Sequence, residues 1–219
     1  MATETATPSG FGQHADMKLV IGDKALSSWS LRPWLLMKHF GVAFQEVRIR
    51  LDQPGTRDEI LRYSSAARVP VLLTEGLAIW DSLAIMEYLN ERFPEKRMYP
   101  ADPQRRAVAR SLTAEMHSGF SALREQLPFQ AKMKIPGHDL ESARADIERV
   151  QEIWRDALAQ SGGPFLMEDF SIVDAMYAPV VCRFDTYAVP LDEALSAYAA
   201  RILNHQALRE WYDGARAEP

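Results

Sequence analysis

The apolar positions of the chain follow two different patterns, and the change comes near residue 100. Before it, short apolar or alternating runs typical of strands are interspersed with runs at helical spacing. The expected strands are 18–22, 44–49, 69–73 and 77–80, and the expected helices are 31–40 and 81–92. Beyond it only helical spacing recurs, over 103–127, 140–160, 172–187, 191–203 and 206–215. The pattern predicts a compact α/β unit followed by an all-helical unit.

Three prolines between Pro94 and Pro103 discourage one continuous helix from joining the two units. We therefore expect one domain over 17–98 and a second over 103–216. Residues 1–16 are small and polar, and they lack the basic start and apolar core of a secretion signal. We expect a disordered tail there.

Composition narrows the classes of function. A formal net charge of -5 gives no electrostatic reason to expect nucleic acid or an anionic membrane as a partner. The single cysteine, Cys182, excludes an intramolecular disulfide and a zinc site built from cysteines, and the five histidines are scattered. No run approaches the roughly 20 apolar residues that span a bilayer. These features predict a cytoplasmic protein that needs no metal.

Three serines lie in the four-residue segment 27–30, between the first expected strand and the first expected helix. Free backbone N–H groups and the positive end of the helix dipole favour an anion at such a position. Serine is also a common helix cap, and Pro33 in the first turn would make Ser30 that cap. Segment 27–30 alone therefore leaves a structural and a functional role open.

Two further polar pairs stand beside expected secondary structure. Val69-Pro70 begins the third strand, where a cis peptide bond would turn the N–H and C=O of Val69 outward as an edge for a peptide-like ligand. Asp81-Ser82 opens the next helix, where the two side chains could cap the helix or bind the ammonium and carboxylate groups of a ligand.

Taken in order, the segments SSxS, VP and DS-LAI-EYL resemble the cytosolic glutathione transferase family. The resemblance extends over the helical half, where Ser171 and Asp174 have the S-x-x-D spacing of a buried capping box. Most members of that family carry Gly at the position of Glu168. The resemblance implies an α/β thioredoxin-like N-terminal domain, an all-α C-terminal domain and a serine-type enzyme.

The resemblance also implies a role for each polar group. Glutathione, the co-substrate, would lie across the end of the first domain with its sulfur facing Ser27, which is five residues before Arg32 as the reactive Cys is in redox relatives. The implied glutathione-binding residues are Ser28, Ser30, Arg68, Val69, Pro70, Asp81 and Ser82. A pocket for a small electrophile would be lined by Trp29, Met116, His117, Phe120 and Arg124, joined by Phe129 and Met133. The family resemblance further implies a homodimer and a role in detoxification.

Three alternatives remain. A thiol–disulfide oxidoreductase would need a cysteine where Ser27 and Ser30 stand, and Cys182 falls inside an expected helix of the other half. A non-catalytic, transferase-like interaction module is compatible with binding residues alone. A glutathione-dependent isomerase of the maleylacetoacetate type shares SSxS, but it carries Cys at the position of Trp29 and a second Arg at that of Trp34.

Overall fold

A four-stranded sheet forms the N-terminal half of the protein in the computed structural model, which describes residues 17–219. The expectation for 1–16 lies outside the described residues. The strands are β1 (Lys18–Ile21), β2 (Gln45–Arg48), β3 (Val71–Thr74) and β4 (Leu77–Trp80). They lie in the order β2-β1-β3-β4, with β1 and β2 parallel and the other neighbours antiparallel. This is the mixed sheet of a thioredoxin-like domain.

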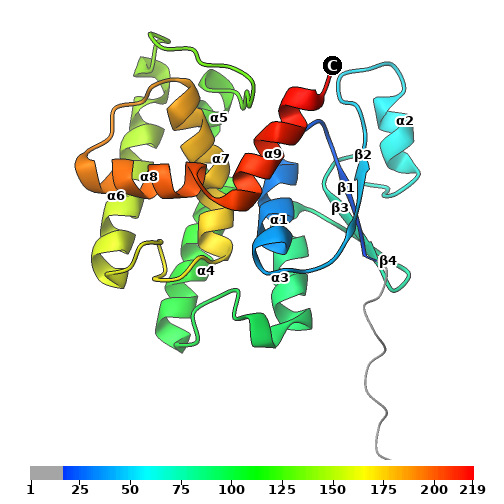
Figure 1. Ribbon diagram of the computed structural model, residues 1–219, viewed down its shortest axis with the longest axis horizontal. Helices are drawn as coiled ribbons and strands as arrows, with labels where there is room; N and C mark the ends of the chain where they lie inside the picture. The colour runs from blue at the N-terminus through cyan, green and yellow to red at the C-terminus, as the bar shows by residue number, and fades with distance from the viewer. Residues whose placement is uncertain (1–16) are drawn as a thin grey trace, which may run out of the picture.

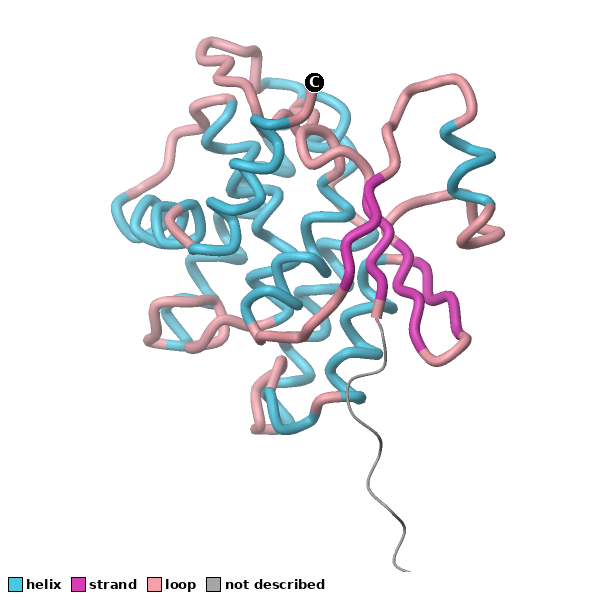
Figure 2. Tube along the Cα trace, turned by 45° about the vertical axis from the view of Figure 1, so that its right-hand side comes forward, coloured by secondary structure: helices cyan, strands magenta, loops and turns pink. Residues whose placement is uncertain are grey.

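Alternation along β1 assigns each face of the sheet to different helices. Leu19 and Ile21 belong to the main core, which includes α1 (Ser28–His39) and α3 (Ser82–Arg92). Val20 points to the opposite face and packs in a smaller cluster with Ile60 of α2 (Thr56–Leu61). Figure 1 shows α2 on one side of the strands and α1 with α3 on the other, and Figure 2 shows the same arrangement from a second direction.

The C-terminal half is helical and packs on α1. Its elements, with the short helix that precedes them, are η1 (Pro94–Lys96), α4 (Pro103–Ser118), α5 (Ser121–Gln126), η2 (Glu141–Ala143), α6 (Arg144–Ser161), α7 (Ile172–Thr186), α8 (Glu193–Leu203) and α9 (Gln206–Ala217). Helix α7 is buried along almost its whole length and contacts α1, α4 and α8. Over 17–219, no helix has the length and apolar character needed to span a bilayer.

Two expected boundaries were wrong. Helix α1 begins at Ser28, so that Ser27 rather than Ser30 is its N-cap and Pro33 lies inside the helix. The single helix expected over 103–127 is two helices, because the chain turns at Gly119 and Phe120. Phe120 takes the left-handed conformation with φ 61°, which ends α4 and begins α5.

The capping box predicted at Ser171 and Asp174 is confirmed. The buried Asp174 carboxylate accepts hydrogen bonds from the backbone N–H groups of Leu166 and Ser171 and from the hydroxyls of Ser171 and Tyr198. Burial raises the pKa of Asp174 to about 6, although these hydrogen bonds act in the opposite direction. Glu168 adopts φ 83°, a conformation that favours the Gly usual at this position. Glu168 therefore stands in a backbone conformation in which a glycine would be unstrained.

Candidate active site

A cavity of about 560 Å³ lies where the sheet domain meets α4. Most of its wall comes from the loop before β3, the end of β4 and the start of α3, and Trp29 of α1 and His117 of α4 complete it. Its lining residues are Trp29, Ala66, Arg68, Val69, Pro70, Trp80, Asp81, Ser82 and His117. Seven of these nine are residues that the sequence predicted for the site, the exceptions being Ala66 and Trp80.

Val69 offers the cavity a free stretch of peptide backbone. The Val69–Pro70 peptide bond is cis. Val69 lies outside β3, and within residues 17–219 neither its N–H nor its C=O forms a hydrogen bond. Buried or half-buried peptide groups are almost always paired in folded proteins. Val69 therefore presents one donor and one acceptor to a peptide-like ligand.

Asp81 is held in place by the helix that it caps. Its Oδ1 accepts hydrogen bonds from the N–H groups of Leu83, at 2.9 Å, and Ala84, at 3.2 Å. Its Oδ2 lies 3.1 Å from Nε2 of His117, across the junction between the two domains. The backbone of Asp81 has φ 79°, a region that non-glycine residues rarely adopt and that costs on the order of 1–3 kcal/mol. The strain is retained at a residue whose carboxylate faces the cavity.

Ser82 supplies unpaired donors beside that carboxylate. Its side chain is buried, and its hydroxyl has no hydrogen-bond partner among the described residues. Its backbone N–H is one of the free N–H groups in the first turn of α3. A ligand carboxylate at this helix end would be stabilised by both donors and by the helix dipole. Asp81 and Ser82 thus offer adjacent positions for a cation and an anion.

The three serines of segment 27–30 are tied into the protein and do not line the cavity. Ser27 Oγ donates to Ser30 Oγ at 2.7 Å and accepts from the Ser30 N–H at 3.3 Å. Ser30 Oγ also accepts from the Gly22 N–H, and Ser28 Oγ accepts from Nη2 of Arg183. Ser28 and Ser30 therefore hold α1 against β1 and α7, whereas the bonds of Ser27 involve only its own helix end.

Trp29 is the residue of this segment that reaches the cavity. Its ring makes an edge contact with His117, with centroids 5.4 Å apart. The guanidinium carbons of Arg32 and Arg124 lie 4.2 Å and 4.7 Å from its ring centroid, within the range of cation–π attraction. The backbone N–H of Trp29 forms no hydrogen bond within residues 17–219. Trp29 therefore connects the cavity with a group of cations behind it.

Several residues predicted for an electrophile pocket lie elsewhere. Met116 on α4 and Phe120 in the turn between α4 and α5 are buried in the main core and do not line the cavity. Phe129 is also a core residue, and the exposed Met133 borders a different hollow. Arg124 does not line the cavity but contacts two residues that do, Trp29 and His117. We assign Met116, Phe120 and Phe129 to packing.

The sequence predicted no role for Arg183, and Arg32 served only to identify Ser27, five residues before it, as the residue that faces the sulfur. Arg32 is completely buried, and Arg183 is nearly so. The signal for Arg183 was present in the sequence, since it is the one cation of α7 and the one charge in the apolar run 175–184. A lone cation in such a stretch indicates either a structural bond or a ligand.

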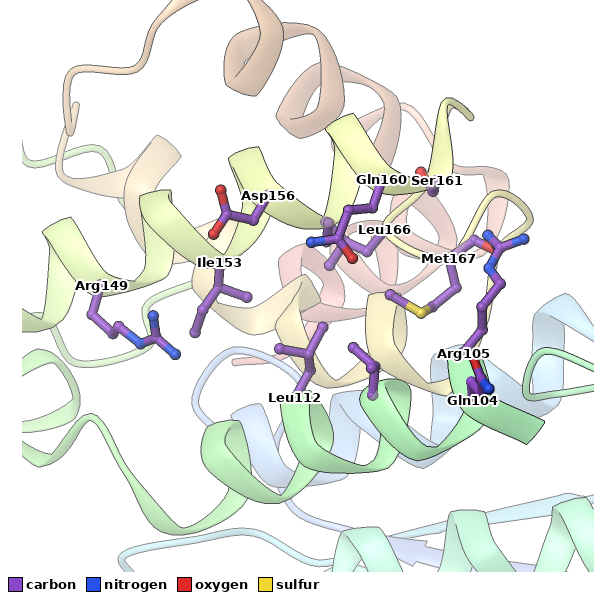
Figure 3. Close-up of a pocket in the computed structure, with 12 residues that line it drawn as sticks. Gln104, Arg105, Leu112, Arg149, Ile153, Asp156, Gln160, Ser161, Leu166 and Met167 are labelled. Carbon is purple, nitrogen blue, oxygen red and sulfur yellow. The ribbon is translucent and has the colours of Figure 1, made fainter. Parts of the chain in front are cut away.

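A second groove of about 400 Å³ lies between α4 and α6. Figure 3 shows Leu112, Ile153 and Met167 pointing into it. Its arginines are already paired: Arg105 with Glu168 at 2.9 Å, and Arg149 with Glu115 at 2.7 Å. Unlike the cavity at the domain junction, this groove has no unpaired buried donor at its wall among the described residues. The junction cavity is therefore the candidate active site.

Comparison with known proteins agrees with the fold. Residues 26–92 match the family described as glutathione S-transferase, N-terminal domain, and residues 106–214 match glutathione S-transferase, C-terminal domain. Maleylacetoacetate isomerase of Rattus norvegicus is 29% identical over 173 residues, which are 75% of this chain and 76% of the relative. A stringent starvation protein A homolog of Pasteurella multocida is 27% identical over 181 residues, covering 80% and 81%.

The same architecture is found in solved structures. A glutathione transferase homolog from Burkholderia GL BGR1, with bound glutathione, superposes with a TM-score of 0.73 at 22% identity, covering 93% of this chain and 100% of that one. At this identity the likeness concerns the fold. The two family matches cover both halves of the chain, and the chain belongs to the glutathione S-transferase superfamily.

Proposed function

We propose that the junction cavity binds glutathione and that the protein joins the glutathione sulfur to a small electrophile. One observation carries the proposal: the free peptide edge of Val69 and the unpaired hydroxyl of Ser82 belong to residues that line the same cavity. Glutathione is a peptide with an ammonium and a carboxylate on its γ-glutamyl residue. A peptide edge, an anion and an anion-binding helix end are the groups that such a ligand requires.

Each end of glutathione has a matching group in this arrangement. The main chain of its cysteine pairs with Val69, as a strand pairs with a sheet edge. The γ-glutamyl ammonium binds the Asp81 carboxylate, and the γ-glutamyl carboxylate accepts from the Ser82 N–H and hydroxyl. His117 already contacts Asp81 at 3.1 Å, so it borders the bound γ-glutamyl group. The sulfur then lies toward the start of α1.

Ser27 stabilises the thiolate in this proposal. A free thiol has a pKa of about 8.5, and lowering it by about two units requires about 2.7 kcal/mol. A hydrogen bond from a hydroxyl to a charged group contributes roughly 1.5–3 kcal/mol. Because a hydroxyl hydrogen rotates freely, Ser27 could turn its hydrogen from Ser30 Oγ to the sulfur. The free N–H of Trp29 adds a second donor at the same helix end.

Isomerisation is the second candidate, because the similarity to maleylacetoacetate isomerase extends over three quarters of the chain. A thiolate that adds to a double bond and then leaves again would use the same site. Trp34 stands where that class carries an Arg, but it is buried against Trp211 and bonded to Glu46, away from the cavity. Trp29, in contrast, lines the cavity. A turnover screen with glutathione and a panel of electrophiles distinguishes conjugation, isomerisation and a non-catalytic binding module.

A homodimer is also part of the proposal. Leu77, Trp80 and Val108 are large apolar side chains that are 53%, 52% and 47% exposed, and burying them in an interface would remove them from water. Light scattering at micromolar concentration is expected to give twice the mass of the chain. The monomer mass would contradict this part of the proposal and leave the site unaffected.

Replacing Asp81 by Asn tests the glutathione site without removing the helix cap. The Asn carbonyl oxygen can still accept from Leu83 and Ala84, whereas the charge that binds the ammonium is lost. We expect glutathione to bind about tenfold or more weakly, since a hydrogen bond to a charged group contributes roughly 1.5–3 kcal/mol. Calorimetry measures the affinity, and urea unfolding measures the stability, which stays near that of the wild type.

Asp156→Asn is the matched control, because Asp156 is a carboxylate at the wall of the other groove. It is expected to bind glutathione as the wild type does. If Asp81→Asn binds equally well, or if the wild type shows no binding at millimolar glutathione, the assignment of the site is wrong.

Replacing Ser27 by Ala tests the role of the hydroxyl. The pKa of bound glutathione, followed by thiolate absorbance across a pH series, is expected to rise by about one to two units, because one hydrogen bond to the charged sulfur is lost. Ser28→Ala is the control, since Ser28 is bonded to Arg183 instead. A rise of the thiol pKa in Ser30→Ala, with Ser27→Ala near wild type, would assign the role to Ser30.

A further inference from the structure

Three arginines from different parts of the fold meet behind the cavity. Arg32 belongs to α1, Arg124 to α5 and Arg183 to α7. Arg32 and Arg124 both lie over the ring of Trp29, and Arg183 reaches the neighbouring Ser28. The start of α1 is therefore surrounded by cations, at the point where the sulfur of glutathione is proposed to lie.

Within residues 17–219, none of the three guanidinium groups has an ion pair with a carboxylate. Burial lowers the pKa of Arg32, and the charges of Arg124 and Arg183 lower it further, while Asp81 and Tyr177 raise it. Burial and Arg124 also lower the pKa of Arg183, to about 10. Asp146 acts on Arg124 in the opposite direction to burial. The three cations thus repel one another in a poorly solvated place.

Arg183 donates through all three of its nitrogens, whereas the hydrogen bonds of Arg32 and Arg124 are incomplete. Nη1 and Nη2 of Arg32 and Nη1 of Arg124 are buried without a hydrogen-bond partner within residues 17–219. Arg32 uses only Nε, which donates to the carbonyl of Met176. Arg124 donates through Nε to the carbonyl of Gly119 and through Nη2 to the carbonyls of Met116 and His117. Buried charged donors are normally paired, so unpaired donors on two adjacent arginines indicate an anionic ligand.

The cluster is connected to the cavity on the side of the helical domain. Trp29 and His117 line the cavity, and the carbonyl of His117 accepts from Arg124. Arg124 is half-buried, whereas Arg32 is completely buried. Arg124 is therefore the arginine that a ligand can touch, while Arg32 and Arg183 contribute their charge from behind it.

We propose that this arginine cluster, Arg32, Arg124 and Arg183, binds the carboxylate of the second substrate, with Arg124 in contact with it. The substrate class is then small electrophiles that carry a carboxylic acid. Nη1 of Arg124 can donate a charge-assisted hydrogen bond to one carboxylate oxygen, while Nε and Nη2 stay bonded to backbone carbonyls of the segment 116–119. This inference rests on the proposed glutathione site, because it places the second substrate beside the glutathione sulfur.

Pairs of glutathione thioethers test the inference directly. S-(2-Carboxyethyl)glutathione and S-(2-carbamoylethyl)glutathione differ only in a carboxylate against an amide, at the place of the second substrate. The S-carboxymethyl and S-carbamoylmethyl pair tests a shorter reach. Calorimetry with the wild type is expected to show the acid of at least one pair binding about tenfold more tightly than its amide, because charge-assisted hydrogen bonds are about twice as strong as neutral ones.

Variants then assign the preference to Arg124. In Arg124→Gln the preference is expected to fall to less than about threefold, while the amide and glutathione itself bind as before. Arg124→Lys, which keeps the charge but loses the planar guanidinium, is expected to keep part of the preference. Arg110→Gln is the matched control, because Arg110 is an exposed arginine of α4 paired with Glu87, and it keeps the full preference. Circular dichroism confirms that each variant is folded.

Four results would overturn the inference. If the wild-type protein binds the acid and the amide of both pairs with equal affinity, the inference is wrong, whatever the variants show. A preference that persists in Arg124→Gln assigns the carboxylate to other residues. A loss of glutathione affinity in Arg124→Gln, equal for every ligand, means that the arginine binds the glycine carboxylate of glutathione instead. No binding of any ligand contradicts the proposed glutathione site itself, which the first three results leave intact.

Discussion

The burial of α1 on both sides is the constraint on which the site depends. One side of the helix packs on the sheet through the core that contains Leu19 and Ile21, and the other contacts α7. Polar bonds fix the register of these contacts, since Ser30 Oγ accepts from Gly22 of the sheet domain and Arg32 donates to Met176 of α7. The start of α1 therefore has one position relative to both domains. The groups around it can be placed accurately only because α1 cannot shift.

Polar groups without hydrogen-bond partners lie near the start of α1 in both domains. Among the described residues, the peptide of Val69 and the hydroxyl of Ser82 lack partners on the sheet side, and the terminal nitrogens of Arg32 lack them on the helical side. Each unpaired buried group lowers the stability of the fold by about 1–3 kcal/mol. These unpaired groups near Trp29 are the reason why we propose that two ligands meet there.

The order of elements and most of the site could be predicted from the sequence, because the signals were local. Strand and helix periods, the Val69-Pro70 pair and the Asp81-Ser82 helix start are each contained in a short segment. The break between α4 and α5 could not be predicted, because a left-handed Phe120 is decided by packing rather than by its own preference. The cap of α1 was misassigned because Pro33 lies inside the helix rather than in its first turn.

The sequence also did not predict which residues of the helical domain lie next to the first domain. The family resemblance placed Met116 in an electrophile pocket, yet it is buried among the helices, while His117 beside it lines the cavity. One residue along a helix rotates the side chain by about 100°, so a small error in the position of α4 exchanges core for cavity. The arginine cluster joins residues from three helices, and only the folded chain shows that they meet.

Backbone amide shifts during a titration with reduced glutathione test the central claim most directly, because they locate the ligand. We predict that the N–H signals of Val69 and Ser82 and the indole N–H of Trp29 move in proportion to occupancy. Signals from Val108 and Met167, in the groove between α4 and α6, are predicted to stay unchanged. Shifts confined to that groove, or no shifts at millimolar glutathione, would contradict the account.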